Sequence, residues 1–260
     1  MLKGWSGIVA GKQGKSLVML ITVCVLFIAG IITYITAKDV FEEVSVKSGK
    51  KYKIVIDSGH GGIDPGKVGV NGAYEKDINL AIALYLKKEL EDKDCEVVMT
   101  RETDTGLYNE NDSSKKAADL KRRVELMNSG NPDAIVSIHQ NSFTQESSKG
   151  AQVFYQTVST EGKKFAEIMQ KQLAESLDKS NKRVAKPNSD YYILKNSKSV
   201  AIIVECGFLS NPQEAQMLVS SDYQKKIAEA VAAGILDYLK TAGTQNETAS
   251  AAGMEWRDIW

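Results

Sequence analysis

The sequence predicts an α/β fold: a single three-layer domain in which a mostly parallel or mixed twisted sheet is flanked by helices. Short apolar runs rich in β-branched residues alternate with longer segments whose apolar residues recur at helical spacing. The alternation extends from about residue 51 to residue 240, without internal repeats. Strands that alternate with helices are typical of a sheet covered by helices.

The predicted elements follow from these patterns in chain order. Predicted strands lie at residues 54–57, 95–100, 134–138, 151–157 and 200–204. Predicted helices include residues 78–90, 117–127, 165–173 and 227–239. A further helix is expected after Asn211, because Asn211 suits an N-cap, Pro212 the first helical position and Glu214 the closure of a capping box.

Composition excludes some classes of function. The 33 Lys and Arg residues balance the 33 Asp and Glu residues, so no basic field predicts a nucleic-acid partner. Cys95 and Cys206 are far apart and form no CxxC motif, which excludes a zinc site built from four cysteines. Whether these two cysteines pair is left open by the sequence.

The N-terminal part contains an apolar segment, residues 17–37, with no charged residue. Its length suffices to cross a bilayer as a helix. Lys3, Lys12 and Lys15 precede it, so the positive-inside rule places the following domain outside the cytoplasm. We expect an uncleaved signal-anchor, because the apolar run is long for a signal peptide and residues 35–37 are a poor cleavage site. Cleavage would instead release a secreted domain.

These observations predict five consecutive segments. They are a cytoplasmic N-terminus (1–16), a transmembrane signal-anchor (17–37), a linker (38–50), a catalytic domain (51–240) and a flexible C-terminal tail (241–260).

Three predicted strands lead into residues that can carry chemistry. The first leads through Asp57 to His60, the third directly to His139, and the last directly to Glu205. The chain has only two histidines, and both lie at such strand ends. Glu75 begins the helix that follows the glycine-rich loop. Ligands of open α/β sheets bind beyond the carboxyl ends of the strands, so we expect these side chains to meet.

Two histidines and one carboxylate around an open coordination position are typical of catalytic zinc. A carboxylate that does not bind the metal can take a proton from water and pass it to a leaving group. We therefore predict one Zn²⁺ per chain, with His60, Glu75 and His139 as candidate ligands and Glu205 as the proton-transfer group.

Each of these residues also has a purely structural interpretation. His60 could cap a turn, and His139 could bond to Asn141 or to a backbone carbonyl. Glu75 could be an ordinary acid in the first turn of a helix, favoured by the helix dipole. These interpretations weaken when the residues are taken together, since all must coincide at one edge of the sheet.

For Glu205 the structural interpretation is an ion pair with an arginine such as Arg101 or Arg122. No HExxH motif is present, so spacing alone is not diagnostic.

Five blocks of sequence resemble one known family. In order they are IVIDSGHGGIDPGKVG, GAYEKDINLAIALYLKKEL, VVMTRETD, DLKRRVELMNSGNPDAIVSIHQNS and AIIVECGFLSNPQEAQML, spread over residues 51–240. Together they resemble the zinc-dependent N-acetylmuramoyl-L-alanine amidases, most of all the germination-specific, spore-cortex members.

The resemblance implies that His60, Glu75 and His139 bind zinc and that Glu205 is the catalytic acid and base. The implied substrate is peptidoglycan, cut at the amide between the lactyl group of N-acetylmuramic acid and L-alanine of the stem peptide. In the spore cortex of a spore-forming bacterium, this step prepares muramic acid for conversion to muramic-δ-lactam by a partner deacetylase. We expect regulation from outside the chain, for example by a protein activator.

Three further residues are candidates for substrate contact or for support of the ligands: Asp57, Asn141 and Lys195. Lys195 belongs to a basic loop, residues 181–198, whose cations either contact stem-peptide carboxylates or are simply solvated. Those cations are Lys182, Arg183, Lys186, Lys195 and Lys198.

Two other functions compete with the amidase. One is a zinc peptidase that cuts within stem peptides, and the other is a non-catalytic wall-binding protein of the same fold. The glycan and cross-link preference and the oligomeric state are not encoded in any pattern of the sequence.

Overall fold

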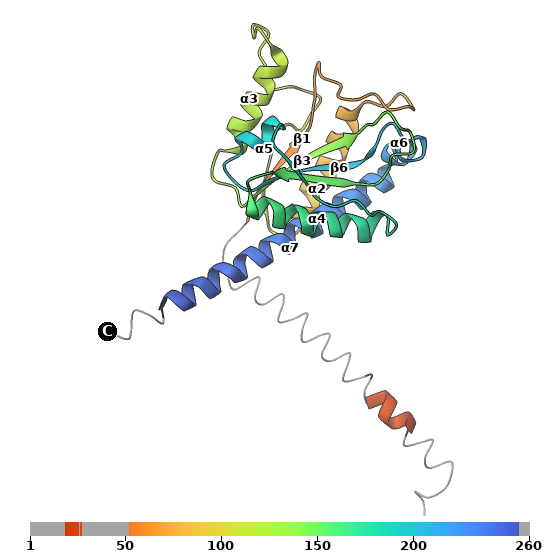
Figure 1. Ribbon diagram of the computed structural model, residues 1–260, viewed down its shortest axis with the longest axis vertical. Coiled ribbons are helices and arrows are strands. Elements are labelled where there is room, and N and C mark those ends of the chain that lie inside the picture. Colours follow the sequence, from red (N-terminus) through yellow and green to blue (C-terminus); the bar gives the residue numbers. More distant parts are fainter. Residues whose placement is uncertain (1–18, 26, 28–51, 255–260) are drawn as a thin grey trace, which may run out of the picture. The chain divides into compact units, whose positions relative to one another are not determined.

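Six strands form one mixed sheet at the centre of the fold (Figure 1). This computed structural model describes residues 19–25, 27 and 52–254. The strand order is β2-β1-β3-β6-β4-β5; β4 is antiparallel to β6 and parallel to β5, and the remaining pairs are parallel. The strands are β1 (Lys53–Ser58), β2 (Glu96–Met99), β3 (Ala134–Asn141), β4 (Gln152–Gln156), β5 (Lys186–Asn188) and β6 (Ala201–Phe208).

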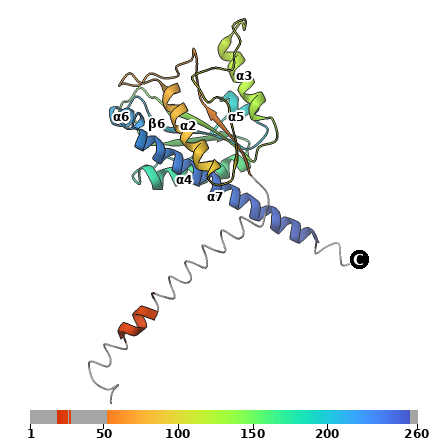
Figure 2. The ribbon, with the colours of Figure 1, turned by 180° about the vertical axis from the view of Figure 1, so that it is seen from behind.

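Helices cover both faces of the sheet (Figures 1 and 2). One face packs against α2, α4 and α7 in the larger hydrophobic core, and the other against α3 and α5 in a smaller core. The helices are α2 (Glu75–Glu91), α3 (Lys115–Met127), α4 (Thr160–Leu177), α5 (Tyr192–Asn196), α6 (Pro212–Leu218) and α7 (Ser221–Met254). The predicted three-layer α/β architecture with a mixed sheet is confirmed.

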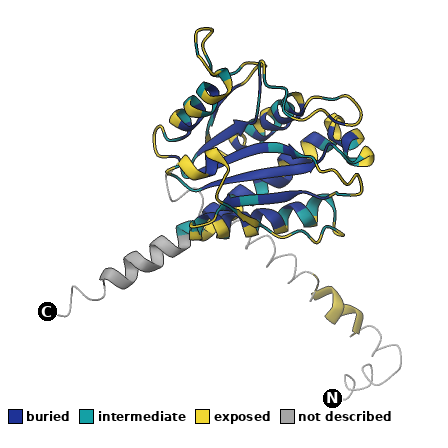
Figure 3. Cartoon of the chain, turned by 45° about the horizontal axis from the view of Figure 1, so that its top comes forward, coloured by how far each residue is buried: buried dark blue, intermediate teal, exposed yellow. Residues whose placement is uncertain are grey.

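The central strands are apolar because both of their faces are covered (Figure 3). Ile54 and Ile56 of β1 belong to the larger core, whereas Val55 between them belongs to the smaller one, and all three are fully buried. The same holds for Ile135 and Val136 of β3. Burial on both sides fixes the register of these strands, and hence the positions of the residues that follow them.

Two strands run further than predicted. β3 continues through His139 to Asn141, and β6 continues through Glu205 to Phe208, so the two chemical residues lie within strands. The cause is that β3 and β6 pair with each other along this extension, with a register shift between His139 and Asn141. Both residues still project past β1, whose last residue, Ser58, pairs with Ile138.

The capping box predicted for α6 is only half formed. Asn211 caps the helix by accepting a hydrogen bond from the Glu214 N–H at 3.0 Å. The Glu214 carboxylate does not return to Asn211. It accepts the N–H groups of Phe208 at 2.7 Å and Gly150 at 2.9 Å, because it is drawn under the loop that precedes β4.

Two segments for which no helix or strand was predicted contain regular secondary structure. The basic loop 181–198 contains β5 and the short helix α5. Helix α7 continues to Met254, so the predicted boundary at residue 240 falls inside a helix and much of the predicted tail is helical.

Cys95 and Cys206 are both buried but cannot be bridged. Cys95 precedes β2 and Cys206 lies on β6, with β1 and β3 between these strands. Three strand spacings of about 4.8 Å each exceed the roughly 7 Å that a disulfide can span between Cα atoms.

The chain divides into two units, residues 1–50 and 51–260. In the first unit, residues 19–25 and 27 are helical. The predicted anchor, residues 17–37, lies for the most part outside the described residues. Within the described ranges, no helix has both the length and the apolar character that crossing a bilayer requires.

Candidate active site

The glycine-rich loop after β1 lets backbone lie directly against side chains of the candidate site. The Gly59 N–H donates to the Ile138 carbonyl at 3.1 Å, which turns the chain across the edge of the sheet. A Cβ atom at Gly59 would lie 2.3 Å from ring atoms of His139, and one at Gly66 would lie 2.6 Å from Glu75 Oε2. Only glycine therefore fits at these two positions without displacing the two side chains.

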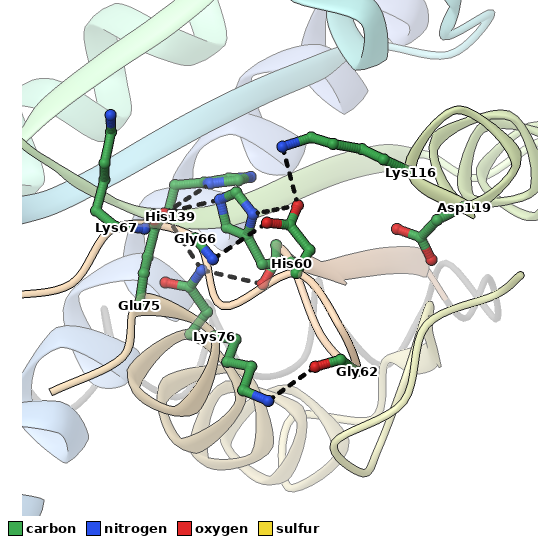
Figure 4. Close-up of polar contacts among 12 residues, drawn as sticks. His60, Gly62, Gly66, Lys67, Glu75, Lys76, Lys116, Asp119 and His139 are labelled. Atoms are coloured by element: carbon green, nitrogen blue, oxygen red, sulfur yellow. Dashed lines mark hydrogen bonds and ion pairs between the residues drawn. The ribbon is translucent and has the colours of Figure 1, made fainter. Parts of the chain in front are cut away.

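His60 is held between two carboxylates (Figure 4). Its Nε2 lies 3.2 Å from Glu75 Oε2, and its Nδ1 is hydrogen-bonded to Asp64 Oδ2 at 2.9 Å. Asp64 is itself held by Lys116, 3.2 Å away, and by the Gly66 N–H at 3.3 Å. An imidazole with one nitrogen fixed by a carboxylate and the other directed into a site is typical of a metal ligand.

Glu75, the first residue of α2, is only 2% exposed. Its Oε2 accepts the Lys67 N–H at 2.8 Å; its Oε1 accepts the Gln140 N–H at 3.1 Å and lies 3.0 Å from His139 Nδ1. Burial alone would raise the pKa of Glu75, but hydrogen bonds from His139 and His60 hold it far below its usual range. Glu75 is therefore an anion at neutral pH.

His139 completes the cluster from β3. Its ring lies edge-on to that of His60, with centroids 4.9 Å apart. Burial alone would lower the pKa of His139, but the hydrogen bond and charge of Glu75 raise it to about 9. One donor atom each from His60, Glu75 and His139 lies within 4.8 Å of the others.

This donor set fits a divalent metal. Two imidazoles and one carboxylate are a known ligand set of catalytic zinc, which keeps a further position open for water or substrate. The carboxylates of Asp64 and Glu205 add negative charge around the cluster, which favours a cation. The backbone of Gly59 and Gly66 also lies directly against two of the three donor side chains, those of His139 and Glu75.

Glu205 lies on β6 and is paired in register with His139. It is 8% exposed, and its Oε2 is buried without a hydrogen-bond partner among the described residues. Burial raises the pKa of Glu205 to about 7, against the opposing charges of His139 and His60. A carboxyl group with a free oxygen and a pKa near neutrality is suited to accept a proton and then return it.

A buried arginine supports the His60 turn from below. Arg123 of α3 donates to the Ser58 carbonyl at 2.7 Å and to the His60 carbonyl at 2.6 Å. Its charge is balanced by Asp57 at 2.8 Å and Asp119 at 2.6 Å. His60 has a φ of 62°, which is unusual for a residue other than glycine and needs such external support.

Arg101 extends this support to the next carbonyl. It donates to the carbonyl oxygens of Ser58 at 3.0 Å and Gly59 at 3.1 Å. Burial and the neighbouring charge of Arg123 lower the pKa of Arg101 to about 10.

Asp57 was expected to contact substrate or to support the ligands, and its buried position fits the second of these roles. Asp57 has no exposed surface, because it lies within the sheet under α3. Besides Arg123, it accepts hydrogen bonds from Thr100 at 2.7 Å and Ser137 at 2.5 Å. Its connection with the site is indirect and passes through Arg123 to the His60 carbonyl.

The alternative partners considered for His139 and Glu205 are not the ones that the structure shows. His139 bonds to Glu75 rather than to Asn141. Arg101 binds carbonyl groups, and Arg122 pairs with Asp112 at 3.1 Å, so neither arginine pairs with Glu205.

The remaining candidates are Asn141, the last residue of β3, and Lys195. The Asn141 side chain accepts the Ser142 N–H at 2.8 Å, and the Asn141 carbonyl accepts the Leu209 N–H at 2.8 Å. Lys195 is exposed on α5. Sequence reasoning missed Asp64 and Arg123; the signal for Asp64 was an acidic residue inside the glycine loop, four positions after His60.

Known proteins are similar to this chain in fold and in sequence. The germination-specific N-acetylmuramoyl-L-alanine amidase of Bacillus subtilis is 37% identical over 197 residues, which cover 75% of this chain and 82% of that protein. The CwlD amidase of Clostridioides difficile, solved in complex with the GerS lipoprotein, is similar with a TM-score of 0.72 at 40% identity, covering 74% of this chain and 100% of that one.

A third similar protein is the catalytic domain of CwlV, an N-acetylmuramoyl-L-alanine amidase from Bacillus (Paenibacillus) polymyxa var. colistinus. Its TM-score is 0.64 at 33% identity, and the match covers 73% of this chain and 98% of that one. The model of one family matches residues 54–237, which include the site described above and all of the sheet except Lys53 at the start of β1. This chain belongs to the N-acetylmuramoyl-L-alanine amidase family.

Proposed function

We propose that this protein is a zinc-dependent amidase that hydrolyses the amide between the lactyl group of N-acetylmuramic acid and L-alanine of the stem peptide. The observation that carries the proposal is the convergence of His60, Glu75 and His139, with the buried carboxyl group of Glu205 beside them. Membership of the amidase family supports hydrolysis of this amide, and the two histidines and one carboxylate support zinc as the metal.

In this proposal His60, Glu75 and His139 hold the zinc ion. The chemistry that zinc supplies when bound is Lewis-acid polarisation of a carbonyl oxygen and acidification of water. Asp64 orients the His60 ring through Nδ1, which leaves Nε2 directed at the metal position. Arg123 fixes the backbone of the same turn.

Glu205 acts twice. Its carboxyl group, whose Oε2 has no hydrogen-bond partner among the described residues, accepts the proton of the attacking water. The same carboxyl group then delivers that proton to the amine of L-alanine as the amide bond breaks. A raised pKa suits both steps, because it makes Glu205 a stronger base as the anion while keeping the proton transferable near neutral pH.

The setting we propose is the spore cortex, outside the cytoplasm. Its basis is the similarity to a B. subtilis amidase named as germination-specific. Residues 17–37 would anchor the chain in the membrane by its N-terminus, ahead of a linker and the catalytic domain. The C. difficile relative was solved with a lipoprotein, so a protein activator is part of the proposal. A muramic acid deacetylase would act on the product.

The test is the mass of the fragments released from peptidoglycan. The full chain is incubated with peptidoglycan, with and without added zinc, and Glu205→Ala serves as the control. The proposal predicts free stem peptides that begin with L-alanine, absent in the variant. Fragments cut within the stem peptide would instead establish a peptidase, and no release with zinc bound would contradict catalysis by this chain alone.

A further inference from the structure

A hollow of about 380 Å³ lies at the same edge of the sheet as Glu205. Its walls come from the loop before β4 and the loop between α4 and β5. The charged residues that line it are Lys149, Lys182, Arg183 and Asp178, so cations outnumber anions three to one. We call these residues the basic pocket.

Gln152 contacts the basic pocket and is paired with Glu205 on the neighbouring strand. β4 runs antiparallel to β6 and places Gln152 directly opposite Glu205. Side chains of such a pair lie on the same face, with Cβ atoms about 5 Å apart. The Gln152 Oε1 accepts a hydrogen bond from Arg183 Nη1 at 3.1 Å. The guanidinium is therefore hydrogen-bonded to the residue that pairs with Glu205 across the two strands.

Arg183 is held in place without having its charge neutralised. Its Nε donates to the Lys149 carbonyl at 2.7 Å, and its guanidinium carbon lies 4.5 Å from the centre of the Phe208 ring. Both hydrogen-bond acceptors are uncharged groups. A planar guanidinium that is fixed in this way is well suited to bind a carboxylate.

The acids near Arg183 accept hydrogen bonds from other groups, although Asp178 also interacts with the charges of Lys149 and Lys182, and Glu214 with that of Arg183. Asp178 accepts hydrogen bonds from the N–H and hydroxyl groups of Ser180 at 2.8 and 2.6 Å. Glu214 accepts two backbone N–H groups under the loop before β4. Within the described part of the chain, Lys149, Lys182 and Arg183 form no ion pair. The pocket thus has positive charge available for a ligand.

The direction of the reaction indicates which part of the substrate lies here. Glu205 delivers a proton to the leaving amine, so the stem peptide begins beside β6, and β4 is the neighbouring strand on the side away from His139. From His139 on β3 to β4 is two strand spacings, roughly 10 Å. An extended peptide covers about 3.3–3.6 Å per residue, so about three residues reach the basic pocket.

We propose that the basic pocket, formed by Lys149, Lys182 and Arg183, binds a free carboxylate of the stem peptide. This inference rests on the proposed amidase function and deepens it. Of the cations in the basic loop 181–198, the proposal assigns peptide binding to Lys182 and Arg183, which line the basic pocket together with Lys149. It also makes the enzyme selective for stem peptides whose carboxylates are not amidated.

The test is a binding measurement that requires no hydrolysis. Isothermal calorimetry with the full, zinc-loaded chain uses two synthetic tetrapeptides that begin with L-alanine, one with free carboxylates and one fully amidated. The test variant is Lys149→Gln/Lys182→Gln. The matched control is Lys171→Gln/Lys225→Gln, which removes the same charge from exposed positions on α4 and α7.

We expect the test variant to bind the acidic peptide about tenfold more weakly than the wild type, because it loses two partly exposed charge-assisted contacts between lysine and carboxylate. The control should bind it within about twofold of the wild type, because charges beyond a Debye length of ~8 Å are largely screened. The amidated peptide should bind weakly and equally to all three proteins. A second variant, Arg183→Lys, keeps the charge but loses the planar fork and should also weaken binding of the acidic peptide alone.

Equal losses in the test and control variants would overturn the proposal, as would a wild type that binds both peptides alike. Failure of the amidase function appears separately, as absence of released stem peptides in the digestion of peptidoglycan.

Discussion

Replacing Asp64 with asparagine tests how the His60 ligand is oriented. The exchange keeps the size of the side chain but removes the negative charge that faces His60 Nδ1 at 2.9 Å. Loss of such an outer carboxylate lowers metal affinity by about 10–100-fold, or about 1.4–2.7 kcal/mol. The Asp64 side chain is 25% exposed and shares its charge with Lys116, so we expect the lower end, about tenfold.

The assay is competition for zinc between the full chain and a chromophoric chelator. The matched control is Asp104→Asn. Asp104 accepts the Gly62 N–H at 2.8 Å and pairs with Lys76 at 2.6 Å, so it holds the same loop without touching a candidate ligand. Its replacement should change the zinc dissociation constant by no more than about threefold, as for an exposed ion pair.

Equal losses of zinc affinity in the two variants would contradict the proposed orientation of His60 by Asp64, since the effect would then come from the loop and not from His60. Wild-type affinity in a correctly folded Asp64→Asn protein would refute it as well.

Three other perturbations address the rest of the site. Gly59→Ala should reduce zinc affinity more than tenfold, because its Cβ would lie 2.3 Å from the His139 ring. The control is Gly72→Ala: Gly72 has a φ of 82° and open space around it, so this change should only lower the free energy of unfolding by about 1–2 kcal/mol. Arg123→Met should lower the free energy of unfolding in urea by about 3–5 kcal/mol, because it leaves a buried carboxylate unpaired; a loss under 1 kcal/mol would contradict the buried pair. Protonated Glu205 cannot accept a proton, so kcat/KM should rise with pH and level off above the pKa of Glu205, about 7. A bound cation should move this pKa somewhat lower. A profile that is flat from pH 5 to 8 would argue against Glu205 as the base.

Much of the fold was predictable because burial dictates the pattern. Strands covered on both faces must be continuously apolar, and β1, β3 and β6 were recognised for that reason. β5 and α5 were missed because three and five residues are too few to show a period. β5 also contains Pro187, which sheets tolerate at an edge.

The meeting of His60, Glu75 and His139 was predictable from topology, since parallel strands bring their carboxyl ends to one edge. The support around them was not. Arg123 lies on a helix far along the chain from His60, and only the fold brings its guanidinium under that turn. The same is true of Gln152, which is placed opposite Glu205 by an antiparallel pairing that no local sequence pattern predicts.

The most direct test of the central claim is to locate zinc in the protein. Crystals of the full chain grown with zinc, with diffraction measured on both sides of the zinc absorption edge, would give the position of the ion. We predict one anomalous peak per chain, about 2.0–2.2 Å from one nitrogen each of His60 and His139 and from a Glu75 oxygen. A peak at any other group of residues, or Glu205 bound as a ligand in place of Glu75, would contradict it.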